Sequence, residues 1–195
     1  MHSLVAMSVL TLALLQSGWA LTQAPPREVR RVYWELVPEM EIFVRLVPEG
    51  QKHQPSVNLV FHAFYPGRAA RDWYTGLPAW PKGVPSRLTI SAEAPPMAIV
   101  RALSLRLTVD DRTTIDFTAP DSRYRFLPCT FATDDCVQTG VESDLAPSIL
   151  RLVVAGRSVG GTALGLPFTL APADQDAVRA FAERVGLWPA REPRR

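Results

Sequence analysis

Hydrophobic and polar residues alternate along much of the first half of the chain. Residues 32–36 and 40–46 carry apolar side chains at every second position, a period typical of strands with one buried face. Residues 57–65 are apolar on both faces, which predicts a central strand covered on both sides. This half of the sequence therefore predicts strands rather than helices.

The middle of the chain continues the strand pattern. Strands are predicted at 87–93 and 99–109, with Leu103 among the inward residues of the second. Residues 113–118 return after the polar turn 110–112, which is a hairpin signal. A further short strand is predicted at 124–127.

The last third changes character. A helix through residues 145–153, capped by Ser143 or Asp144, is favoured over a strand at 150–154 because its apolar spacing fits a helical face. Residues 162–170 then predict one strand.

The clearest helix is predicted at 172–185. Proline suits its first turn, its apolar residues form one stripe, and Gly186 ends it.

Together these elements predict a mainly β protein: an antiparallel β-sandwich of about seven to nine strands with one or two C-terminal helices. A single domain is expected over 21–188, with a disordered tail at 189–195.

The first twenty residues are read as a signal peptide. Residues 4–15 are apolar and uncharged, and the small residues Gly18 and Ala20 suit cleavage after Ala20. An uncleaved membrane anchor is the alternative, but the run is shorter than the ~20 residues that span a bilayer. We therefore expect a periplasmic or secreted protein with no stable membrane span after cleavage.

The two cysteines agree with export. Cys129 and Cys136 are the only cysteines in the chain. In an oxidising compartment they would close a short loop, whereas a metal site needs more ligands and a thioredoxin-like pair needs closer spacing. A structural disulfide between them is predicted.

Composition narrows the function classes. The chain has 195 residues, 47% of them hydrophobic, and a net charge of +2. That charge is too small for electrostatics to dominate binding to a phosphate backbone, so no nucleic-acid partner is expected. The common metal and nucleotide fingerprints are missing, and no cofactor or metal is expected.

A resemblance is carried by the order of features in the last half. The turn at Asp110 and Asp111 is followed by the cysteine loop, the segment Asp-Leu-Ala-Pro-Ser-Ile-Leu at 144–150, Ala-Gly-Arg at 155–157, a strand and a final helix. Residues 103–185 resemble in this order the invasion-associated locus B family of exported bacterial proteins. The resemblance implies a secreted β-sandwich without an established catalytic activity. The chain departs from that family because its N-terminal half has no cysteine.

The loop 68–82 is the best candidate for a binding surface. It reads RAARDWYTGLPAWPK. Aromatic and arginine side chains on a long loop are typical of binding sites, although tryptophans also fold back and cover the end of a sheet. The candidate ligand-binding residues are Arg68, Arg71, Trp73, Tyr74 and Trp80.

Catalytic candidates are weaker. Gly156–Gly160 spells GxSxG around Ser158, but a strand rather than a helix is predicted after it and no histidine follows, so a polar turn is favoured. His62 on the central strand is a weak candidate for a base, against a hydrogen-bonded structural histidine. The aspartate pairs at 110–111 and 134–135 are interpreted as solvated turns rather than as binding sites for a cation.

The function expected from the sequence is an exported, non-enzymatic binding or envelope-associated protein. Its partner would be an unknown protein, glycan or other envelope component, contacted through the loop 68–82, and no catalytic residue is assigned. The alternative is an exported hydrolase without a recognisable motif, whose best residues would be His62 and one of the aspartate pairs 110–111 and 134–135.

Overall fold

The described residues fold into two antiparallel sheets and two helices. The structure is a computed structural model, and it describes residues 27–34, 39–50, 57–67, 79–93, 103–117, 123–128 and 137–189. The larger sheet has the strand order β1 (Val29–Trp34), β2 (Glu39–Leu46), β4 (Asn58–Pro66), β5 (Arg87–Glu93), β9 (Val137–Asp144) and β8 (Arg123–Pro128). The smaller has the order β3 (Glu49–Gly50), β11 (Leu166–Thr169), β10 (Val159–Ala163), β6 (Leu105–Val109) and β7 (Thr113–Asp116). The helices are α2 (Pro147–Ala155) and α3 (Pro172–Arg184).

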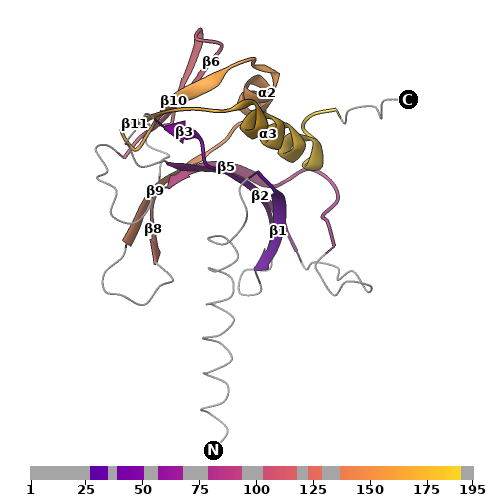
Figure 1. The fold of residues 1–195 in the computed structure, drawn as a ribbon. Helices are drawn as coiled ribbons and strands as arrows, with labels where there is room; N and C mark the ends of the chain where they lie inside the picture. Colours follow the sequence, from indigo (N-terminus) through magenta and orange to yellow (C-terminus); the bar gives the residue numbers. More distant parts are fainter. Residues whose placement is uncertain are drawn as a thin grey trace, which may run out of the picture.

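This arrangement confirms the predicted mainly β class with C-terminal helices. The described residues form eleven strands, more than the seven to nine expected, and the two-residue β3 is among the additional ones. Figure 1 shows the six-stranded sheet as an arch, with α2, α3 and the smaller sheet above its outer face. The two faces of the arch are called the outer and the inner face below.

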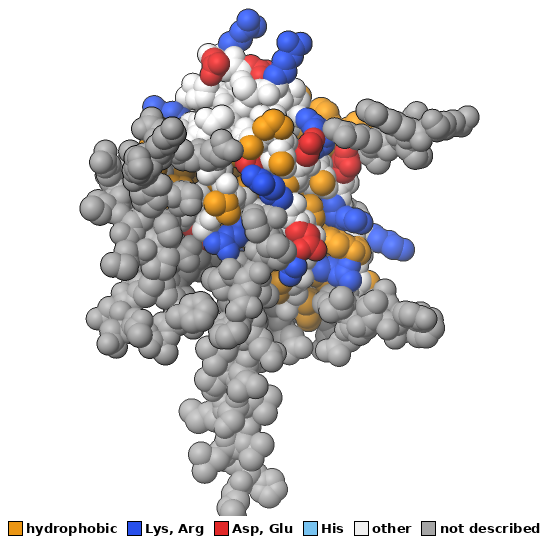
Figure 2. Space-filling model, viewed as in Figure 1, with side chains coloured by type: hydrophobic (Ala, Val, Ile, Leu, Met, Phe, Trp, Pro, Cys, Tyr) orange, Lys and Arg blue, Asp and Glu red, His pale blue; other side chains and the backbone are white. Residues whose placement is uncertain are grey.

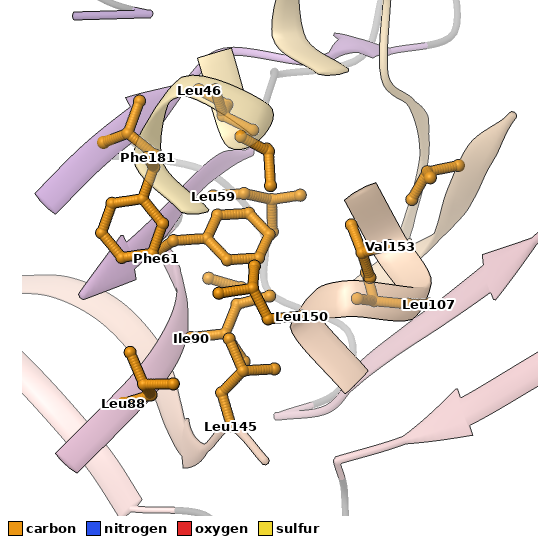
Figure 3. Packing of buried hydrophobic residues seen from close by; sticks show 14 of the residues in the cluster. Leu46, Leu59, Phe61, Leu88, Ile90, Leu107, Leu145, Leu150, Val153 and Phe181 are labelled. Carbon is orange, nitrogen blue, oxygen red and sulfur yellow. The ribbon is translucent and has the colours of Figure 1, made fainter. Parts of the chain in front are cut away.

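One hydrophobic core lies between the outer face, the helices and the smaller sheet. Alternate residues of β2 and β4 point into it, and residues of β6 and α2 meet them from the other side. Phe61 of β4 and Phe181 of α3 are both 0% exposed, with ring centroids 6.3 Å apart. Figure 3 shows this packing, in which Leu150 and Val153 approach the sheet from α2. Burial raises the pKa of Tyr65, at the end of β4, to about 12.

The inner face is buried as well, which the sequence did not predict for β2. Its alternation suggested one buried face, yet Glu41 is 2% and Phe43 1% exposed. Phe43 and Val60 form a small second apolar cluster with Val32. The prediction of one solvent-facing side for residues 40–46 is therefore wrong, because Glu41 pairs with His62 and Phe43 packs with Val60 on the inner face.

The start of the first C-terminal helix differs from its prediction. The helix itself is confirmed as α2, but Ser143 and Asp144 belong to β9. The N-cap is Ala146, which has no side-chain capping bond, and the helix begins with proline. Ser143 cannot cap it because its Oγ donates to the backbone oxygen of Phe117 at 3.0 Å.

The single strand predicted at 162–170 is a hairpin. β10 and β11 pair antiparallel, with Ala163 opposite Leu166. Leu164 and Gly165 have φ of 54° and 77°, the left-handed conformation that a two-residue hairpin turn requires. The sequence does not indicate this turn, because Leu164 is not a usual turn residue.

The other strand and helix predictions hold with shifted ends. β6 begins at Leu105, and Leu103, expected to point inward, is 37% exposed. Asp110 and Asp111 form the turn to β7 with φ of 53° and 55°, a conformation that Asp tolerates. The helix at 172–185 is confirmed as α3, and its predicted apolar stripe is buried.

Candidate functional site

The predicted binding loop is described only at its end. Arg68, Arg71, Trp73 and Tyr74 lie outside the described residues. Trp80 is half-buried and packs against the core, so it resembles the expected inward-folded tryptophan more than a free stacking platform. Its surroundings nevertheless make it the centre of a charged surface.

Two arginines stack on Trp80. The guanidinium carbon of Arg31, on β1, lies 4.5 Å from the centroid of the indole ring, and that of Arg184, at the end of α3, lies 4.3 Å from it. The end of a helix favours a cation, which accounts for Arg184 there. Cation–π contacts then hold both guanidinium groups at one ring. We call Arg31, Trp80 and Arg184 the Trp80 surface.

The charges of the Trp80 surface are not neutralised by described carboxylates. Two other arginines of this region are paired: Arg27, before β1, bonds Asp174 at 2.7 Å, and Arg30, on β1, bonds Glu28 at 2.7 Å. Neither Arg31 nor Arg184 has an ion pair in the described part of the chain. Figure 2 shows Lys and Arg side chains gathered with hydrophobic ones on the side of the molecule where α3 ends. Two positive groups are thus held in place and available to an anion.

A buried polar chain crosses the inner face. Glu41, His62 and Ser91 come from the adjacent strands β2, β4 and β5, and each is at most 2% exposed. His62 Nδ1 lies 2.5 Å from Glu41 Oε1, and His62 Nε2 lies 3.0 Å from Ser91 Oγ. An acid, an imidazole and a hydroxyl in this order match the group that orients a base, the base itself and the nucleophile that it activates. We call these three residues the Glu–His–Ser chain.

The surroundings of the Glu–His–Ser chain are aromatic on two sides. The ring of Phe64 stacks on His62 at 6.0 Å between centroids, and Phe43 lies 6.5 Å away. Thr89 is directly opposite His62 and 1% exposed, and its Oγ1 has no hydrogen-bond partner among the described residues. A buried hydroxyl without a partner is uncommon and costly.

Sequence analysis found only one member of this group. His62 was a weak candidate, whereas Glu41, Ser91 and Thr89 were not singled out. Glu41 occupies a polar position of the alternation with Met40 and Ile42, so nothing in the sequence distinguished it from a solvent-facing residue. The pairing of β2, β4 and β5, which brings the residues together, is not visible in the sequence.

A cleft of about 600 Å³ opens where β5 begins and β9 ends. Its apolar lining includes Leu88, Leu145 and Ile149. Arg87 and Asp144, which belong to the inner face by their register, line it too. The cleft therefore lies at the ends of β5 and β9, beside the start of α2, and neither Thr89 nor Ser91 lines it.

The GxSxG segment is a turn, as expected. Ser158 is exposed and lies between α2 and β10, so a strand follows it instead of the helix that a nucleophile elbow requires. Asp110 was expected to be a solvated turn residue, but its Oδ1 accepts hydrogen bonds from the backbone N–H of Arg157 at 2.7 Å and of Ser158 at 3.0 Å. These two bonds are the main cause that holds the pKa of Asp110 below its usual value.

Replacing Asp110 with alanine is expected to destabilise the protein at neutral pH and less in acid. The folded pKa is lowered, so the carboxylate contributes stability above the unfolded pKa of about 3.9 and loses it as pH falls through the folded pKa. Melting temperatures of the native protein and D110A at pH 7 and near pH 2.5 measure this difference. D111A is the control, because Asp111 has a similar φ of 55°. An equal difference in melting temperature between the native protein and D110A at both pH values would contradict this role of Asp110.

Other predicted chemistry lies outside the described residues. This holds for Asp134, Asp135 and the signal peptide, and for Cys129 and Cys136. The flanking strands β8 and β9 pair with Pro128 opposite Val137, each one residue from a cysteine. The disulfide stays a prediction that this register supports. No group of three potential metal-ligating side chains occurs in the described part of the chain.

Comparisons with known proteins give no match. Neither a protein-family model, nor a curated protein, nor a solved structure matches this chain. The resemblance of residues 103–185 to the invasion-associated locus B family therefore stays a prediction. Within the described ranges, no helix has the length and apolar character needed to cross a bilayer.

Proposed function

We propose that this chain is an exported binding protein whose partner is anionic and docks on the Trp80 surface. The observation that carries the proposal is the pair of guanidinium groups on one indole, neither with an ion pair among the described residues. Export is supported by the apolar N-terminal segment and the two cysteines of the sequence.

The stacking explains how the surface is prepared for a ligand. Arginine side chains lose rotamer freedom when they bind, and the indole holds both guanidinium groups before the ligand arrives. Their N–H groups remain able to donate to carboxylate, phosphate or sulfate oxygens. The indole rings are occupied by arginines, so Trp80 acts by positioning charge rather than by stacking on a sugar.

The ligand class follows from this chemistry. Two fixed cations, with an exposed Lys82 two residues along the chain from Trp80, favour a polymer with repeated negative charges over a single ion. An acidic glycan of the cell envelope meets that requirement, and the exported location argues against nucleic acid. We therefore take heparin, a sulfated glycan, as the probe.

Loss of either stacked arginine is expected to weaken heparin binding. The native protein should be retained on a heparin column at low salt, and R31A and R184A should each lower its affinity about tenfold, the value of one charge-assisted hydrogen bond. Elution salt and isothermal titration measure the change. W80A should weaken binding too, because it releases both guanidinium groups.

The matched control is R106A. Arg106 is equally charged and exposed, but it pairs with Asp116 at 2.7 Å on the smaller sheet. It should bind heparin as the native protein does, and unchanged melting temperatures establish that each variant is folded. If R106A weakens binding as much as R184A, the attraction is diffuse and the Trp80 surface is not the site.

A further inference from the structure

We propose that the Glu–His–Ser chain gives the protein a second activity, the hydrolysis of an uncharged carboxylic ester with Ser91 as nucleophile. His62 is the general base, and Glu41 is the residue that positions it. This inference concerns the inner face and uses no residue of the Trp80 surface. Its failure and that of the proposed function are therefore separate outcomes.

The sheet presents the three side chains in a fixed order. Phe43, His62 and Thr89 are consecutive cross-strand partners, so Glu41 and Ser91, each two residues along a strand from one of them, share the same face. The ladder of hydrogen bonds on both sides of β4 fixes this geometry. Catalytic groups on strands are held more precisely than groups on loops.

The contacts of His62 assign its proton. An ionised Glu41 carboxylate only accepts, so at 2.5 Å it takes the hydrogen of Nδ1. Nε2 then carries the lone pair and accepts the hydrogen of Ser91 Oγ at 3.0 Å. This tautomer is the one in which an imidazole removes the proton of a serine hydroxyl.

Thr89 supplies a hydrogen-bond donor for the transition state. Its unpartnered Oγ1 lies on the same face as Ser91 and two residues before it, about 6.6 Å along the strand. In the proposed reaction, the oxygen of the tetrahedral carbon bonded to Ser91 Oγ accepts a hydrogen bond from Thr89 Oγ1. A donor that finds its partner only when negative charge develops is what stabilises an oxyanion, and it explains why the hydroxyl has no partner at rest.

The surroundings select the substrate class. The rings of Phe43 and Phe64 flank His62, and Val60 is directly opposite Ser91. This apolar environment disfavours a charged acyl group. The substrate is therefore an ester of a short, uncharged acyl chain.

The reaction balances with ester and water alone. Ser91 Oγ bonds to the ester carbonyl carbon while its proton moves to His62 Nε2, and the carbonyl oxygen becomes the oxyanion near Thr89. The bond to the alcohol breaks, and the alcohol leaves with the proton from His62. Water then attacks the acyl-serine, its proton passing through His62, and releases the acid and free Ser91. Ser91 is 1% exposed, so labelling by a fluorophosphonate tests directly whether a reagent reaches its hydroxyl.

The test uses the intact chain with p-nitrophenyl butyrate and a fluorophosphonate. We expect ester turnover, one fluorophosphonate per chain, and the label on the peptide that contains Ser91. S91A should abolish labelling and lower kcat/KM at least a hundredfold. S158A, which changes the serine of the GxSxG turn, should leave both unchanged.

T89V separates a catalytic role from a structural one. Valine has the shape of threonine without the hydroxyl, and Thr89 Oγ1 makes no hydrogen bond with the described part of the chain. The variant should keep its melting temperature while kcat falls about a hundredfold at nearly constant KM. The peptide map of the labelled native protein needs no variant, so it decides the case even if S91A does not fold. Absent turnover, absent labelling, or a label on any other residue would overturn the proposal.

Discussion

Phe181→Ala is expected to lower the free energy of unfolding by about 3–5 kcal/mol, the usual cost of removing a buried phenylalanine ring. The ring is 0% exposed and packs against Phe61, which joins α3 to the outer face of the larger sheet. The space it leaves is bounded by strands on one side and by α2 on the other, so the surroundings cannot close it easily. A typical domain has only about 5–15 kcal/mol of stability in total.

Chemical denaturation of F181A measures this loss, and L152A is its control. Leu152 lies on α2 and is 36% exposed, so its removal is expected to cost well under the value for Phe181. The comparison separates core packing from helix propensity, because both changes place alanine in a helix. Similar midpoints for F181A and the native protein would show that α3 does not close the core.

Strands such as β2 could be predicted because burial of the core-facing side imposes a period of two, whereas no strand was predicted at β9, Val137–Asp144. Met40, Ile42 and Val44 point to the core, and the alternation that reveals them needs no knowledge of the partner strand. The helix α3 could be predicted for the same reason, from its apolar stripe and from Gly186 at its end. Each signal is local.

The errors arise where tertiary context overrides the local signal. Leu164 adopts a φ of 54° in a turn, which its side chain disfavours, because β10 and β11 must both pair. Leu103 continues the apolar alternation of β6 and is nevertheless exposed, since the strand begins two residues later. Neither outcome follows from composition or from periodicity.

The Glu–His–Ser chain shows the same limit for function. Its members are 21 and 29 residues apart in pairs. Their contact depends on β4 lying between β2 and β5 and on the register of both pairings. The long connection 67–86 hides that register, because a tight hairpin turn is what fixes register from sequence. A polar residue in an apolar strand signals only that a partner must exist.

The two candidate sites occupy opposite faces of one sheet. Arg31 is opposite Ile42, whose side chain enters the core on the outer face, whereas Glu41 points to the inner face. A substitution in the Trp80 surface therefore leaves the Glu–His–Ser chain in place. If both proposals hold, the protein docks on a polyanion with one face and hydrolyses an ester at the other.

Gly161→Ala is expected to destabilise the protein by about 3 kcal/mol or more, because it meets two obstacles. Gly161 has a φ of 151°, which L-residues rarely adopt. A Cβ at this position would lie 2.0 Å from the backbone oxygen of Arg106 on the neighbouring strand β6. A backbone atom paired in a sheet cannot rotate away as a side chain does, so β10 and β6 must separate.

The separation of β10 from β6 in G161A is expected to be confined to the smaller sheet, in addition to lowering the stability of the protein. β10 lies in the middle of the smaller sheet, between β11 and β6, and carries Val159, which is 1% exposed, into the core. Hydrogen exchange of G161A should therefore rise in β6, β10 and β11 and stay low in β2 and β4. T162A is the control, since Thr162 is exposed on the same strand and its removal costs under about 1 kcal/mol. A G161A variant as stable as T162A would mean that β10 and β6 do not approach as closely as described.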